Sequence, residues 1–255
     1  MQKLAHPNII VLTHGWTGSS VFSALFGQAG YWLGSETVLK PDYNTFENAD
    51  LVGLNRRLFE ALMPNFDHGQ RFDYEEVMQI ESRAAALDLS PWREFAARCN
   101  EHSPWLWKDP RLTWSIRVWA QLLDLRNTAF LVLTRDDTQA WISTNIRRYI
   151  QSHRFTREYN QATTQSNLRF LQDRGLPYVE ASFEDLLLAP EKTLEKLNGL
   201  VGTTLTMEHL RKVCQEPLGR KSRDWKDFIV ASLIYAKNYG ERNGRGRGAP
   251  PHKIA

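Results

Sequence analysis

The sequence predicts an α/β protein whose core is an open parallel β-sheet flanked by helices on both faces. Short apolar runs alternate with segments that carry apolar residues at helical spacing, and this alternation is typical of parallel sheets covered by helices. At 255 residues, of which 42% are hydrophobic, the chain can bury one substantial core. The predicted strands are residues 8–13, 105–108, 129–134 and 178–181.

Helical patterns connect these strands. The predicted helices include residues 49–62, 115–125, 140–150 and 191–201. The stretch 64–101 has no readable motif, and we expect it to form helices that lie over the ligand cleft. Residues 1–239 are therefore predicted to be a single domain, and the Gly/Arg/Pro-rich residues 240–255 a disordered tail.

The first predicted strand leads into a turn rich in glycine, threonine and serine, and then into a helical pattern. This order directs backbone N–H groups and a helix N-terminus to one point, which suits an anion. The turn is not a Walker A loop, because the lysine of the Gly-Lys-Ser/Thr signature is absent. The predicted phosphate-binding residues are Gly15, Trp16, Thr17, Gly18, Ser19 and Ser20.

Three of the four strands are followed by polar or basic residues, at 14–20, 108–111 and 135–137. Ligands of such sheets bind at the carboxyl ends of the strands, so these residues are predicted to form a single site. Arg135 ends one strand and Ser143 lies eight residues later, a spacing that lets a guanidinium and a hydroxyl reach one phosphate. The alternative is a surface arginine and an ordinary helical serine.

Composition narrows the class of ligand and the location. A net charge of +3 gives no reason to expect a nucleic acid partner, but it is compatible with a small anion. The two cysteines form neither a disulfide framework nor a zinc motif, which indicates a reducing compartment. No apolar run approaches the roughly 20 residues of a membrane span, and no signal peptide is visible. We therefore expect a cytoplasmic protein with no metal; its oligomeric state stays open.

In combination, the motifs resemble the sulfotransferase family, which has a P-loop NTPase-like architecture and takes a sulfuryl group from 3′-phosphoadenosine 5′-phosphosulfate (PAPS). The resemblance covers roughly residues 8–202. It rests on five segments in order: the loop 16–20, the segment Asn44-Thr45-Phe46-Glu47-Asn48, the segment Lys108-Asp109-Pro110-Arg111, the pair Arg135 and Ser143, and the strand, acidic helix, proline break and long helix of 178–202.

The resemblance implies specific roles. The loop would hold the 5′-phosphosulfate, Arg135 with Ser143 would hold the 3′-phosphate, and adenosine 3′,5′-bisphosphate would be the product. The chain departs from the family at Trp16, where a basic residue usually stands. Charge builds on the bridging oxygen during sulfuryl transfer, and an indole cannot stabilise it. Three groups could take the place of that cation: Lys108, which is our first choice, Lys40 and His14.

An acceptor hydroxyl, expected on a carbohydrate or other small metabolite, also needs a base. Glu47 is similar in position to an acidic residue near the acceptor in bacterial members, and His14 is the alternative. Asp109 is predicted to cap a helix that begins at Pro110.

We also expect some of the nine tryptophans, such as Trp32, Trp105 and Trp107, to shape the acceptor cleft. Two rival functions remain. A nucleotide-binding protein that has lost catalysis would explain Trp16. A small-molecule kinase would require the missing lysine and a Mg²⁺-binding acid at a strand end.

Overall fold

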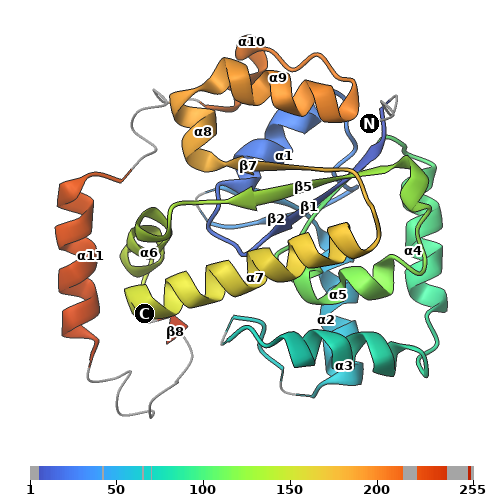
Figure 1. Cartoon of the computed structure of the whole chain (residues 1–255), viewed down its shortest axis with the longest axis horizontal. Coiled ribbons are helices and arrows are strands. Elements are labelled where there is room, and N and C mark those ends of the chain that lie inside the picture. The colour runs from blue at the N-terminus through green and yellow to red at the C-terminus, as the bar shows by residue number, and fades with distance from the viewer. Residues whose placement is uncertain are drawn as a thin grey trace.

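The fold is built on a four-stranded parallel sheet in the order β4-β1-β5-β7, which lies between two layers of helices (Figure 1). The computed structural model describes residues 6–41, 43–64, 66–69, 71–214, 223–239 and 252–253. All four predicted strands are confirmed. They are β1 (Asn8–Thr13), β4 (Leu106–Lys108), β5 (Thr128–Thr134) and β7 (Tyr178–Ser182).

Alternate residues of β1 face different helical layers. Ile10 and Leu12 pack in one apolar cluster, and Ile9 and Val11 pack in the other, because successive strand side chains point to opposite faces. The first cluster is completed by α2 (Ala49–Leu62), α3 (Tyr74–Ala84), α4 (Ser90–Asn100), α5 (Leu112–Trp119) and α7 (His153–Asp173). The second is completed by α1 (Ser19–Gln28), α8 (Phe183–Leu188), α9 (Pro190–Val201) and α10 (Met207–Val213).

Smaller elements lie around this core. An antiparallel pair, β2 (Thr37–Leu39) and β3 (Asn44–Asn48), follows α1, and a 3-10 helix covers Leu125–Asn127. Helix α6 (Asp137–Ile146) follows β5 and packs against α11 (Trp225–Lys237) (Figure 1). Of the predicted tail, only His252–Lys253 is described; it forms β8, which pairs with β6 (Tyr149–Ile150). The rest of 240–255 lies outside the described residues.

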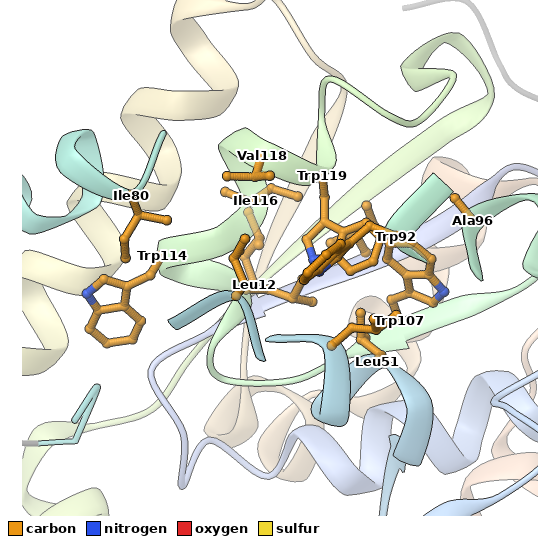
Figure 2. Packing of buried hydrophobic residues seen from close by; sticks show 14 of the residues in the cluster. Leu12, Leu51, Ile80, Trp92, Ala96, Trp107, Trp114, Ile116, Val118 and Trp119 are labelled. Atoms are coloured by element: carbon orange, nitrogen blue, oxygen red, sulfur yellow. The ribbon is translucent and has the colours of Figure 1, made fainter. Parts of the chain in front are cut away.

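Tryptophans fill the core on the α5 side of the sheet, as Figure 2 shows for Trp107 and Trp119. Trp105 and Trp107 are fully buried and stacked, with ring centroids 4.4 Å apart. The prediction that these two residues shape the acceptor cleft is therefore wrong, because they face the apolar cluster. Trp32 stacks on His102 instead, with centroids 4.6 Å apart.

Two helices differ from prediction at both ends, whereas the helices at 49–62 and 191–201 are confirmed to within one residue. The helix predicted at 140–150 is α6, which begins earlier because the Asp136 carboxylate accepts the Gln139 N–H. It ends before Arg148, whose φ of +62° is incompatible with a helix. The helix predicted at 115–125 is α5, which covers Leu112–Trp119.

Helices α3 and α4 pack against α2 and α5 on one side of the sheet. Helices α3 and α4 confirm that 64–101 forms helices, and their covering of the ligand cleft stays a prediction. The loop before α3 lies near the segment that follows β4. Burial lowers the pKa of its His68 to about 4, and the nearby charges of Arg111 and Asp109 also act on that pKa, in opposite directions. No helix among the described residues has the length and apolar character needed to cross a membrane.

Candidate active site

The loop between β1 and α1 lies at the carboxyl edge of the sheet and turns sharply. Gly15, Trp16 and Gly18 all have positive φ, at +81°, +58° and +71°. The Thr17 side chain is buried and bonds to the Thr13 hydroxyl, which ties the loop back to β1. Helix α1 starts at Ser19 with no side-chain cap. Its Val21 N–H donates to the Gly18 carbonyl oxygen at 2.8 Å, so the N–H groups that precede it are the ones available to an anion.

Position 18 requires glycine for two reasons, its positive φ and the close approach of the Phe183 ring. A Cβ at this position would lie 2.2 Å from Cδ2 of Phe183, the first residue of α8. The aromatic ring therefore packs directly on the loop backbone, and this contact joins the end of β7 to the end of β1. The acidic helix expected within 178–202 is α8, but no local pattern indicated the contact.

Arg135 connects the loop to β5 and α8. Its Nη1 donates to the Trp16 carbonyl oxygen at 3.0 Å, and its guanidinium lies over the Phe183 ring at 5.1 Å. Its side chain is only 8% exposed, and its Nε lies 3.6 Å from Glu184 Oε1 without a hydrogen-bond partner. Burial lowers the pKa of Arg135, with Glu184 opposing the shift, yet an arginine stays charged at neutral pH.

Ser143 and Arg223 complete a cationic cluster around Arg135. Ser143 is buried in α6, and Arg223 Nε donates to its hydroxyl at 3.4 Å. Arg223 is held in place by Gln139, which exchanges two hydrogen bonds with its backbone, at 2.6 and 3.0 Å. The charge of Arg223 also lowers the pKa of Arg135, so the two guanidinium groups lie close together.

Sequence reasoning missed Arg223. No role was predicted for the basic residues before α11, of which Arg220 and Lys221 lie outside the described residues. The signal that could have identified Arg223 is its place in a basic run just before the Asp224 helix cap.

Lys108 and Glu47 form a buried ion pair at the end of β4. Lys108 Nζ donates to Glu47 Oε1 and to the Thr45 carbonyl oxygen, both at 2.8 Å. Lys108 is 3% exposed, and burial lowers its pKa while the Glu47 charge opposes the shift. Phe46, between Thr45 and Glu47, has a φ of +56°, which is strained for a bulky residue. Two candidate catalytic residues from separate strands are therefore paired.

Lys40, the second candidate for the missing cation, also lies near this pair. Its charge contributes to the lowered pKa of Lys108. A different cation lies beside Trp16 itself: the Arg147 guanidinium is 5.7 Å from the centre of the Trp16 ring.

Asp109 has a structural role that differs from the predicted one. Helix α5 begins at Leu112, so Asp109 does not cap a helix that starts at Pro110. It is fully buried and accepts hydrogen bonds from Asn55 Nδ2 and from the backbone and guanidinium of Arg111. These contacts fix the segment that follows β4, and with it the position of Arg111.

His14 is buried on the other face of the sheet edge from Lys108. It continues the alternation of Ile10 and Leu12, whereas Lys108 continues that of Leu106, which belongs to the α1 cluster. Burial lowers the pKa of His14 to about 4, and the charge of Arg135 contributes in the same direction. His14 is therefore neutral at pH 7. It lines a cavity of about 300 Å³.

The predicted site residues thus separate into three neighbouring groups along one edge. The loop meets the cationic cluster of Arg135, Ser143 and Arg223 beside β5. The Lys108–Glu47 pair lies beside β4, and His14 lies at the end of β1 between them. No group of three or more His, Cys, Asp or Glu side chains in the described part of the chain could hold a metal ion.

Comparison with known proteins agrees with this architecture. No family model matches the chain, and no curated protein matches it. Among solved structures, the sulfotransferase domain of the Synechococcus PCC 7002 olefin synthase aligns with a TM-score of 0.52 and 14% identity, covering 92% of this chain and 96% of that one. The sulfotransferase domain from the curacin biosynthetic pathway aligns with a TM-score of 0.50 and 17% identity, covering 85% and 80%. The chain has the fold of these domains, which confirms the predicted fold class.

Replacing Gly18 with alanine should destabilise the protein by about 2–4 kcal/mol, because alanine must adopt a left-handed backbone and displace the Phe183 ring. Urea unfolding followed by tryptophan fluorescence measures this. Gly53→Ala is the matched control: its Cβ meets nothing within 4 Å inside α2, so it should stabilise by about 0.5–1 kcal/mol. Equal effects of the two substitutions would contradict the contact.

Acid should weaken the fold partly through His14. Its pKa is about 4 in the folded protein against 6.5 unfolded, so below pH 6.5 the unfolded chain binds the proton preferentially. Between pH 7 and pH 5 this linkage costs about 2 kcal/mol of unfolding free energy. Urea unfolding at both pH values should show that His14→Gln loses less stability than the parent protein by about that amount. An identical loss in both proteins would refute the buried neutral state.

Proposed function

We propose that this protein is a sulfotransferase that binds PAPS and sulfates a hydroxyl of a carbohydrate or other small metabolite. The observation that carries the proposal is the buried Arg135. Its guanidinium is anchored to the loop carbonyl of Trp16, yet its Nε lacks a hydrogen-bond partner, and a buried serine and a second arginine stand beside it. Such a cluster next to an open helix N-terminus suits a ligand with two separate anionic groups. The fold of the sulfotransferase domains supports it.

The residues present fit the proposed nucleotide. The N–H groups of Thr17–Ser20 would hold the 5′-phosphosulfate, and Arg135, Ser143 and Arg223 would hold the 3′-phosphate. These groups supply hydrogen-bond donors and positive charge, which is the complement that a phosphate requires. Bound PAPS would supply an activated sulfuryl group for transfer to a hydroxyl.

Lys108 is the cation best placed to stabilise the reaction. Two of its three N–H bonds are used by Thr45 and Glu47, so the third is available to a ligand. A charge held rigidly in a buried site acts more strongly than one in water, and it needs no rearrangement during the reaction. Glu47 holds this charge in place, while Trp16 contributes none.

Two groups could take the proton of the acceptor hydroxyl. The Glu47 carboxylate has one oxygen outside the bond that it accepts from Lys108. The neutral His14 imidazole can accept a proton at pH 7. They lie on opposite faces of the sheet edge, so the side from which the acceptor enters decides between them.

The rival functions differ in observable ways. A kinase would need the absent loop lysine and a set of Mg²⁺ ligands, which the described residues do not provide. The other rival, a protein that binds the nucleotide without catalysis, is favoured only by Trp16, which stands where a basic residue is usual. It would give high affinity for adenosine 3′,5′-bisphosphate and no turnover of PAPS.

Calorimetry should show that the protein prefers adenosine 3′,5′-bisphosphate to adenosine 5′-monophosphate, and that Mg²⁺ has no effect. Arg135→Ala should weaken the bisphosphate by roughly 10- to 100-fold, since it removes a charged hydrogen bond of about 1.5–3 kcal/mol. Binding of adenosine 5′-phosphosulfate should weaken less, because that ligand loses only the anchor of the loop at the Trp16 carbonyl oxygen. Arg126→Ala is the control, because that arginine is 91% exposed and pairs only locally with Asp124. Preference for ATP with Mg²⁺ would revive the kinase.

Lys108→Ala should lower turnover of PAPS at least 100-fold while changing nucleotide affinity far less, because the charge acts mainly in the transition state. Release of adenosine 3′,5′-bisphosphate measures turnover, and calorimetry measures affinity. Lys212→Ala, on the exposed surface of α10, is the control. Unchanged turnover would move the role to Lys40 or His14, and no turnover in the parent protein would favour a binding protein.

A further inference from the structure

Helix α11 exposes a large share of the apolar surface of the molecule. Five of the ten large hydrophobic side chains that are exposed in the described part of the chain lie within its 13 residues. One face of the helix packs on α6, where Ala231 is buried and the rings of Phe228 and Tyr235 lie 5.6 and 6.3 Å from that of Trp141. Figure 1 shows α11 at the edge of the molecule, beyond α6, so its other side faces outward.

The outward side of α11 carries a continuous apolar stripe. Trp225, Ile229 and Leu233 are spaced four residues apart, so they lie one above the other along the helix. Trp225 is 67% exposed and Leu233 is 65% exposed. At 3.6 residues per turn this side is opposite Ala231, which is buried against α6. The three side chains are called the outer stripe below. Exposed apolar patches of this kind mark interaction surfaces.

Neither the neighbouring sequence nor a second copy of the chain suits the outer stripe. Residues 215–222 contain one large apolar side chain, Leu218, and residues 240–251 contain no large aliphatic or aromatic side chain. A stable interface between proteins buries about 800 Å² on each partner. The outer side of a 13-residue helix is only about 20 Å long and 10 Å wide, which is too small for such an interface.

Positive charge is concentrated around the outer stripe. Lys226 and Lys237 stand beside it at the two ends of α11, and Lys226 Nζ is 5.7 Å from the centre of the Trp225 ring. Residues 215–255 contain nine Lys or Arg and four Asp or Glu, a net charge of +5 in a chain whose total is +3. The rest of the chain is therefore slightly acidic. An apolar stripe flanked by cations is the complement of a bilayer surface with anionic headgroups.

We propose that α11 docks on the surface of a membrane that contains anionic lipids. The helix lies parallel to the surface, with the outer stripe inserted among the headgroups and Lys226 and Lys237 reaching the lipid phosphates. At 13 residues it is too short to span a bilayer, which takes about 20. Arg223 directly precedes α11 and is bonded through its backbone to Gln139 of α6, so docking also sets the cationic cluster close to the surface. Sulfuryl transfer is not required for this binding.

Flotation of the full chain with lipid vesicles tests the docking. The protein should float with vesicles of phosphatidylcholine and phosphatidylglycerol in equal parts. It should bind vesicles of phosphatidylcholine alone at least tenfold more weakly, and high salt should weaken its binding to the mixed vesicles. The double variant Trp225→Ser/Leu233→Ser should lower affinity for the mixed vesicles at least tenfold, because it removes most of the inserted apolar surface.

Leu39→Ser/Leu188→Ser is the matched control. It also removes two strongly exposed apolar side chains, but from β2 and the end of α8, and it should leave flotation unchanged. Urea unfolding should show that both double variants keep the stability of the parent protein to within the effect of an ordinary surface substitution. Lys226→Gln/Lys237→Gln should weaken binding to the mixed vesicles about tenfold and barely affect binding to phosphatidylcholine.

Several outcomes would overturn the proposed docking. Failure of the parent protein to float with the mixed vesicles would do so, as would equal binding to both kinds of vesicle or equal losses in the two serine double variants. Sedimentation equilibrium adds a further test. A parent dimer that Trp225→Ser/Leu233→Ser converts to a monomer would assign the outer stripe to a second copy of the chain. Flotation is measured without nucleotide, so its result is separate from that of the calorimetry on the proposed function.

Discussion

The buried guanidinium of Arg135 is the interaction on which the rest of the site depends. It bonds to the Trp16 carbonyl, covers the Phe183 ring and faces Glu184, so it joins the ends of three adjacent strands. A buried cation is costly unless it is paired, and each of these contacts lowers that cost. The loop owes its shape to the same centre, because Phe183 also leaves no room for a side chain at Gly18.

The same principle organises the other charges along this edge. Lys108 is buried and is held by Glu47 and a backbone carbonyl, while Asp109 is buried and is held by Asn55 and Arg111. Each charge is thereby fixed in direction before a ligand arrives. Preorganised charges of this kind stabilise developing charge without the reorganisation that water would require. Arg135 differs in that its buried Nε faces the Glu184 carboxylate at 3.6 Å without forming a hydrogen bond, which is a reason to regard it as a ligand group.

The two-residue period of the strands also gives the site its two sides. Residues of one parity lead to Arg135 and Lys108, and residues of the other lead to His14 and Thr134, while the Arg135 side chain also lines the cavity beside His14. Trp16 becomes less anomalous in this arrangement, because charge is supplied from neighbouring elements.

Local pattern was enough to predict the parallel sheet, the loop at Gly15–Ser20 and the likeness to sulfotransferases, because strand length, glycine placement and helical spacing are properties of adjacent residues. It also put Arg135 and Ser143 near one another, since their spacing spans one strand–helix turn. Only the tertiary structure decided the pairing of Lys108 with Glu47, the approach of Arg223, the burial of Trp105 and Trp107, and the face on which His14 lies. These depend on contacts between segments 60 or more residues apart, or on which helix covers a strand, and no local period encodes them.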